Sequence, residues 1–177
     1  MQFQLSRIRV PAGFVLGVLY FFFSRPTWTS LAVGLSVALV GLMMRAWAAG
    51  YLSKNRRLAT GGPFALTRNP LYFGTFLIGS GFSIAGRTLV FLIVFLAGFG
   101  AIYGSTVRQE AKHLQVMFPD DYAQYRERVP LFFPHLGPVE RGDHRFSMEQ
   151  YWKNHEYRAL LGFLVAVIVL VLKVYYS

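Results

Sequence analysis

A short stretch between two apolar runs gathers side chains that can bind a polar ligand. Residues 61–74 read GGPFALTRNPLYFG, and Arg68, Asn69 and Tyr72 supply a cation, an amide and a hydroxyl within five positions. The two prolines fix the backbone, and the glycines let a ligand or a second backbone approach closely. This pattern favours a binding corner at the entrance of a membrane span. The alternative is a proline-capped helix start with arginine and tyrosine as interfacial anchors.

The acidic residues mark a second polar segment. All eight lie between Glu110 and Glu156, and none precedes them in the chain. Apolar residues at helical spacing follow Glu110, as in an amphipathic helix that lies at a membrane surface. Pro119 is expected to end or bend this helix, and a second short helix can then carry Tyr125 and Arg128. The alternative for Glu110 is a solvated residue that pairs with a neighbouring lysine or arginine.

The composition is that of a small polytopic membrane protein. Of the 177 residues, 54% are hydrophobic and 15% are charged, which is unlike a soluble domain. The predicted spans, with soft edges, are Val10–Phe23, Leu31–Ala49, Leu71–Gly86, Thr88–Ser105 and Ala159–Tyr176. We therefore predict an all-α polytopic membrane protein, a single domain over residues 1–177, with about five transmembrane helices and cytosolic interfacial helices.

Basic residues are concentrated on one side of the predicted spans. They lie before the first span, between the second and third, and between the fourth and fifth. The positive-inside rule then places the N-terminus in the cytosol and the C-terminus on the opposite side. In this interpretation most of the net charge of +10 serves to orient the protein in the membrane, so we expect no nucleic-acid partner. Arg45, inside the second span, is interpreted as snorkelling to the interface, with a buried role as the alternative.

Metal and thiol chemistry are disfavoured by the residues available. Cysteine is absent, which excludes disulfides, thiolate metal sites and a cysteine nucleophile. The four histidines show none of the spacings typical of metal ligands. No metal site is predicted.

Taken together, the two polar segments resemble the integral-membrane methyltransferase family of isoprenylcysteine carboxyl methyltransferase and the phospholipid N-methyltransferases. The family pattern is G-P-[YF]-x-x-x-R-[HN]-P-x-Y, then a hairpin of spans, then E-E-x-x-L-x-x-x-F-G-x-x-Y-x-x-Y-x-x-x-V-P. It covers roughly residues 50–135, the expected cofactor-binding core. The matching positions are Gly62, Pro63, Phe64, Arg68, Pro70, Tyr72, Glu110, Leu114, Phe118, Tyr122, Tyr125, Val129 and Pro130. The predicted span at 159–176 has no counterpart in the pattern.

Three positions depart from the family pattern. Asn69 stands where many members carry histidine, Ala111 replaces the second glutamate, and Pro119 replaces the glycine before the tyrosine pair. These differences bear on the acceptor more than on the cofactor.

The resemblance implies S-adenosyl-L-methionine as cofactor and a lipophilic or prenylated acceptor that reaches the protein from the lipid bilayer. The residues expected to bind the cofactor are Pro63, Phe64, Arg68, Asn69, Tyr72 and Glu110. Tyr125 and Arg128 are the expected catalytic residues, with Arg128 holding an anion on the acceptor or, alternatively, a lipid phosphate. A carboxylate acceptor is favoured, because an anion that meets a sulfonium reacts readily in a dry site without a dedicated base.

Other functions stay open at this point. A phospholipid amine is the second acceptor class, and its proton would have to be removed. A non-catalytic membrane subunit or a small transporter is the alternative of a different class, although no proline- or glycine-broken pair of spans recurs in matching halves. A membrane reductase with a nicotinamide cofactor is a third possibility.

Overall fold

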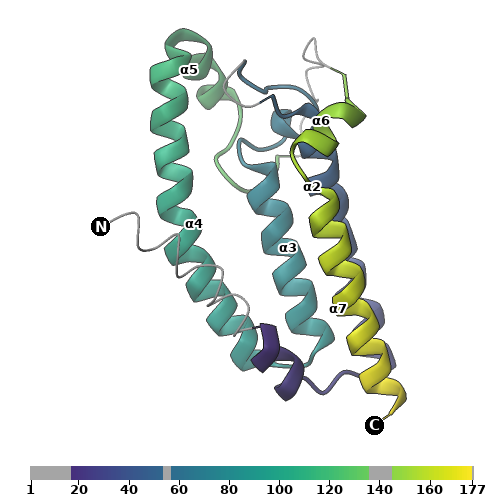
Figure 1. Ribbon diagram of the computed structural model, residues 1–177. Coiled ribbons are helices and arrows are strands. Elements are labelled where there is room, and N and C mark those ends of the chain that lie inside the picture. Colours follow the sequence, from purple (N-terminus) through teal and green to yellow (C-terminus); the bar gives the residue numbers. More distant parts are fainter. Residues whose placement is uncertain (1–16, 54–56, 136–144, 177) are drawn as a thin grey trace.

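The computed structural model describes residues 17–53, 57–135 and 145–176, and its regular structure in these ranges is helical (Figure 1). A helical segment at 17–23 comes first. The further elements are α2 (Trp28–Tyr51), the 3-10 helix η1 (Gly62–Ala65), α3 (Pro70–Ala85), α4 (Leu89–Met117), α5 (Pro119–Arg128), α6 (Met148–Lys153) and α7 (Tyr157–Tyr175). The prediction of an all-α protein is confirmed.

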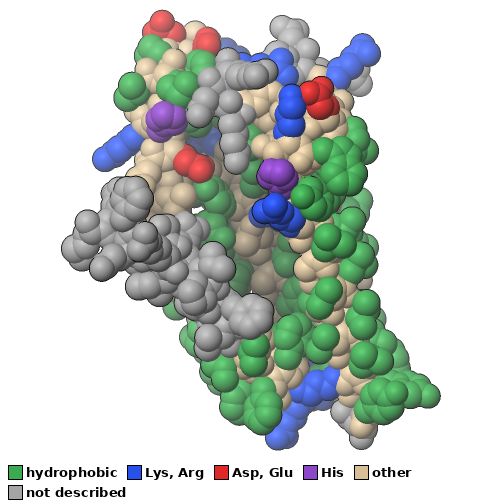
Figure 2. All heavy atoms as spheres, viewed as in Figure 1, with side chains coloured by type: hydrophobic (Ala, Val, Ile, Leu, Met, Phe, Trp, Pro, Cys, Tyr) green, Lys and Arg blue, Asp and Glu red, His purple; other side chains and the backbone are tan. Residues whose placement is uncertain are grey.

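Three of these helices, α2, α4 and α7, are long and apolar enough to cross a membrane by length and composition. The helix α3 is a shorter apolar helix of 16 residues. These four correspond to four predicted spans, whereas the first half of Val10–Phe23 lies outside the described residues and its second half, 17–23, is helical. The chain is therefore an integral, multi-pass membrane protein, and its orientation stays a prediction. In Figure 2 acidic side chains lie toward the end that carries α5 and α6, and hydrophobic side chains cover the flank of α7.

Local sequence signals explain where the helices begin. Thr27 caps α2, since its hydroxyl accepts a hydrogen bond from Ser30 N (3.2 Å) while the Ser30 hydroxyl accepts one from Thr27 N (2.9 Å). A proline opens both α3 and α5, where its missing N–H costs nothing. These starts place the residues of the polar corner immediately before α3.

Glycines set the spacing between α2 and α3, which pack side by side. A Cβ atom on Gly81 would lie 2.5 Å from Gly34 O, and one on Gly41 would lie 2.5 Å from Gly74 O. Small residues at such contacts let two helix backbones approach closely in a membrane. The helix α4 packs less closely, and Val107 is its buried residue. Toward α5 it diverges from α3 (Figure 1).

The predicted division between the fourth span and a separate interfacial helix is wrong. Residues Leu89–Met117 form one continuous helix of 29 residues that includes Glu110. Residues 105–117 contain neither glycine nor proline, so nothing interrupts the helix as it leaves the apolar region. The predicted break at Pro119 is confirmed, because α4 ends at Met117 and α5 begins at the proline.

Candidate functional site

The polar corner before α3 is held in place by the segment that follows α5. Residues 66–69 lie along residues 130–135, and main-chain and side-chain hydrogen bonds connect them. These include Arg68 N to Pro130 O (2.9 Å), His135 N to Leu66 O (3.0 Å), Thr67 Oγ1 to Phe132 O (2.8 Å) and Asn69 Nδ2 to Leu131 O (2.8 Å). Two segments more than 60 residues apart in sequence thus form one rigid wall.

Tyr125 ties α5 to the start of this corner. Its side chain is buried, and its hydroxyl donates a hydrogen bond to Phe64 O at 2.6 Å. Burial raises the pKa of Tyr125 well above its ordinary value, so the phenol keeps its proton at physiological pH. Tyr125, which was predicted to be catalytic, therefore holds the turn at Phe64, because its hydroxyl proton is donated to the Phe64 carbonyl.

Gly62 lets the chain turn into η1. Its φ is +57°, a left-handed conformation that side chains with a Cβ rarely adopt. A Cβ atom there would lie 2.7 Å from the ring of Tyr51, the last residue of α2. The glycine in the predicted motif therefore packs the corner against the end of α2.

A cavity of about 380 Å³ lies between the end of α2, the corner, α4 and α5. Its size is typical of a site for a small organic ligand. Most of the predicted site residues line it, namely Phe64, Arg68, Asn69, Tyr72, Glu110 and Tyr125. Pro63 is fully buried and lies outside the lining, and Arg128 is exposed at the end of α5 and also lies outside it.

The cavity brings together a carboxylate and a guanidinium. The Tyr72 hydroxyl donates to Glu110 Oε1 at 2.7 Å, across α3 and α4. Arg68 Nη1 donates to the Tyr122 hydroxyl at 3.3 Å. Arg68 Nε is buried and finds no hydrogen-bond acceptor among the described residues. A buried charged donor without an acceptor is costly, so this wall of the cavity is suited to an anionic group of a ligand.

Comparison with known proteins shows the family of the chain. A family model described as phospholipid methyltransferase matches residues 14–121. The chain belongs to the phospholipid methyltransferase family. The matched region includes the corner, Tyr72 and Glu110, and it ends within α5, before Tyr125. No solved structure matches the chain.

Two of the proteins that are similar to this chain are named for metal resistance. It is 36% identical to the cobalt-zinc-cadmium resistance protein CzcN of Cupriavidus metallidurans, over 79% of this chain and 67% of that protein. It is 35% identical to the nickel-cobalt-cadmium resistance protein NccN of Alcaligenes xylosoxydans xylosoxydans, over 62% of this chain and 54% of that protein. The protein-S-isoprenylcysteine O-methyltransferase of Schizosaccharomyces pombe is 29% identical, over 46% of this chain and 35% of that protein.

Several cavity residues were not predicted from the sequence. His113 lies on α4, three residues after Glu110, and lines the cavity. Tyr122 was part of the family pattern but was given no role. Arg57, one of the basic residues between the second and third predicted spans, also lines the cavity. The signal for His113 was its helical spacing from Glu110, which puts both side chains on one face.

The interpretation of Arg45 as a snorkelling residue was wrong. Arg45 Nε and Nη2 donate to the two carboxylate oxygens of Glu156 at 2.6 and 2.9 Å, and its side chain is only 23% exposed. Arg45 also lines the cavity. The buried carboxylate of Glu156, just before α7, thus holds the charge that was expected to reach the membrane interface.

Within the described ranges, no group of three or more histidine, aspartate or glutamate side chains is placed to hold a metal ion. The polar side chains that line the cavity are three arginines, three tyrosines, Glu110, His113, Asn69 and Ser53, which suit an organic zwitterion better than a cation alone.

Proposed function

We propose that this protein transfers a methyl group from S-adenosyl-L-methionine to a lipophilic acceptor in the bilayer. The observation that carries the proposal is the cavity that is lined both by Arg68, whose Nε finds no acceptor among the described residues, and by the Tyr72–Glu110 pair. Membership of the phospholipid methyltransferase family supports it. S-adenosyl-L-methionine supplies an activated methyl group together with a carboxylate, two cationic centres, hydroxyls and an adenine.

Each of these features has a partner of suitable chemistry in the cavity wall. Arg68 would hold the carboxylate, because a guanidinium makes strong charge-assisted hydrogen bonds to carboxylates. Glu110 would favour the cationic part and accept hydrogen bonds from amine or hydroxyl donors. Phe64 gives an apolar surface for the adenine ring. These residues bind and orient the cofactor, and positioning is the main contribution to a transfer of this kind.

The orientation of the site is part of the proposal. The cavity lies at the end of the helices that the positive-inside rule assigns to the cytosol, where a water-soluble cofactor is available. The acceptor would arrive laterally from the lipid. A carboxylate acceptor is favoured, since it needs no proton removed before it reacts, and Tyr125 is committed to Phe64 O.

One observation favours an amine as the second candidate acceptor. His113 lines the cavity one helical turn after Glu110, and a neutral imidazole is the usual group that takes a proton near pH 7. An amine acceptor requires such a base, whereas a carboxylate acceptor does not.

A transfer assay with labelled S-adenosyl-L-methionine separates these acceptors. The purified protein is offered a prenylcysteine analogue and, in parallel, phosphatidylethanolamine vesicles. We expect methylation of the prenylcysteine carboxylate, with His113→Gln leaving it nearly unchanged. Loss of about 100-fold in His113→Gln on phosphatidylethanolamine would instead assign the amine reaction. A parent protein that binds a reduced nicotinamide but not S-adenosylhomocysteine would contradict the proposal.

Arg128 is tested in the same assay as a clamp for an anionic acceptor. We expect Arg128→Ala to lower turnover by about tenfold or more, with unchanged affinity for S-adenosylhomocysteine, because the lost contact is to the second substrate. Arg128→Lys should recover only part of the activity, since an ammonium cannot reproduce the bidentate fork. Full recovery by lysine would assign Arg128 to lipid phosphate, and full activity of the alanine variant would exclude the clamp.

The two resistance proteins among the relatives suggest a physiological setting. We propose that methyl transfer by this chain contributes to tolerance of cobalt, zinc or cadmium. Expression in a metal-sensitive bacterial host should raise the tolerated metal concentration, and Glu110→Gln should lose this effect although the protein still accumulates in the membrane. Equal tolerance from both forms would instead favour a non-catalytic membrane subunit.

A further inference from the structure

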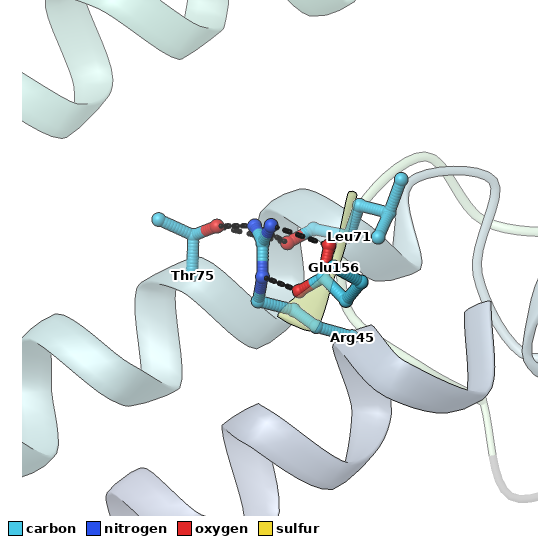
Figure 3. Close-up of polar contacts among 4 residues, drawn as sticks. All are labelled: Arg45, Leu71, Thr75 and Glu156. Carbon is cyan, nitrogen blue, oxygen red and sulfur yellow. Dashed lines mark hydrogen bonds and ion pairs between the residues drawn. The ribbon is translucent and has the colours of Figure 1, made fainter. Parts of the chain in front are cut away.

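Arg45 lies where α2, α3 and α7 meet, and its guanidinium is held from two sides (Figure 3). Nε and Nη2 form a two-pronged contact with the Glu156 carboxylate, at 2.6 and 2.9 Å. Nη1 donates to Thr75 Oγ1 at 2.6 Å on the second turn of α3. The Glu156 side chain is 6% exposed, so the carboxylate is held between the helices and not in solvent.

A buried ion pair of this kind gives little net stability over apolar residues of the same size. Its value lies in fixing one geometry, because two parallel hydrogen bonds allow little rotation of the guanidinium. The surrounding chain is adapted to it. A Cβ atom on Gly74 would lie 2.5 Å from Cγ of Arg45, so the last glycine of the polar corner makes room for this side chain.

The turn between α6 and α7 contacts the end of α2 through the Asn154 side chain. Asn154 Nδ2 donates to Ala49 O and to Leu52 O, both at 2.9 Å, and so satisfies carbonyls that the helix end leaves without partners. His155 then takes a φ of +55°, and Glu156 follows at the start of α7. Leu52, held by Asn154, is itself a lining residue of the cavity.

We propose that Glu156 is a positioning residue of the cofactor site, that it acts through Arg45, and that α6 and α7 complete this site. The inference rests on the proposed function, since it takes S-adenosyl-L-methionine as the ligand. These helices lie outside the region matched by the family model. Glu156 orients Arg45 in the cavity wall and also cancels its charge. Without the carboxylate, an uncompensated cation would face a site that must accept a sulfonium.

This dual role predicts a difference between two ligands. S-adenosyl-L-methionine carries a positive sulfur, and S-adenosylhomocysteine carries a neutral one. Glu156→Gln keeps the size of the side chain and removes its charge. We expect it to weaken binding of S-adenosyl-L-methionine by about tenfold and binding of S-adenosylhomocysteine by clearly less. Calorimetric titration of the purified protein measures both affinities.

Two further variants separate this role from general support of the fold. Thr75→Val removes the other side-chain partner of Arg45 without changing charge, and it should weaken both ligands equally, by about threefold. Lys173→Met is the matched control, because Lys173 Nζ joins the far end of α7 to Phe21 O and Phe22 O. Lys173→Met is expected to leave both affinities unchanged even if it lowers the unfolding temperature.

The outcomes distinguish the two proposals. A parent protein that binds neither ligand overturns the proposed function and this inference with it. If the parent protein binds the ligands, and Glu156→Gln and Thr75→Val bind both of them as tightly as the parent does, the inference alone is overturned. Equal losses for the two ligands in Glu156→Gln, matched by Lys173→Met, would show that α7 only supports the fold and would also overturn it.

Discussion

Replacing Arg68 with methionine is expected to weaken binding of S-adenosylhomocysteine by about 100-fold, because two charge-assisted hydrogen bonds to the carboxylate are lost. The same change should leave the unfolding temperature of the free protein unchanged or raised. Arg68 Nε is buried without an acceptor among the described residues, so the free protein carries a desolvation cost that methionine removes. Titration calorimetry and thermal unfolding, measured on the same preparation, check both parts.

Thr88→Val is the control for this experiment. Thr88 Oγ1 is also buried without a partner within the described part of the chain, but it lies in the turn between α3 and α4, outside the cavity lining. Its replacement should raise stability slightly and leave ligand affinity alone. If Arg68→Met destabilises the protein yet binds the ligand normally, the assignment of Arg68 to the carboxylate is wrong.

Replacing Glu110 with glutamine is expected to weaken binding of S-adenosyl-L-methionine by about 10- to 150-fold, the equivalent of one hydrogen bond to a charged group. Glutamine keeps the size of the side chain and an oxygen that can still accept from the Tyr72 hydroxyl. The loss would therefore report the charge and not the contact with Tyr72. Titration with the cationic donor is the measurement.

Two further variants serve as comparisons for Glu110→Gln. Tyr72→Phe removes a neutral hydroxyl that donates to Glu110 Oε1 at 2.7 Å, and it should cost about fivefold in affinity. Glu149→Gln removes a carboxylate that pairs with Lys153 on α6 outside the cavity lining, and it should cost nothing. Unchanged affinity in both Glu110→Gln and Tyr72→Phe would exclude the α3–α4 pair from the cofactor site.

The parts of the site that lie close in sequence could be predicted, because their spacing alone brings them together. Arg68, Asn69 and Tyr72 lie within five residues around the start of α3, so any fold of that segment keeps them near each other. Glu110 was harder, since it joins Tyr72 only through the pairing of α3 with α4. The family pattern supplied that connection, because it records both segments in order.

The pair of Arg45 and Glu156 could not be predicted. The two residues are 111 positions apart, and no short-range pattern relates them. A single arginine near the end of a span is usually explained by its reach to the interface. Glu156 lies just before an apolar run, where a carboxylate is usually interpreted as a solvated residue at the start of a helix. Only the packing of α7 beside α2 shows that each charge is the other's partner.

The unbroken length of α4 exceeds the thickness of the hydrocarbon core of a bilayer. A helix of 29 residues is about 43 Å long, whereas the hydrocarbon core of a bilayer is about 30 Å thick. Glu110 lies about 32 Å along the helix from Leu89, so in a bilayer whose far boundary lies at Leu89, with α4 upright, its charge would emerge near the end of the hydrocarbon. The 19 residues of α7 span about 29 Å and leave little excess. In that placement a thicker bilayer would draw Glu110 toward hydrocarbon, where a charge is costly, and we expect the chain length of the lipid to affect ligand binding in the cavity.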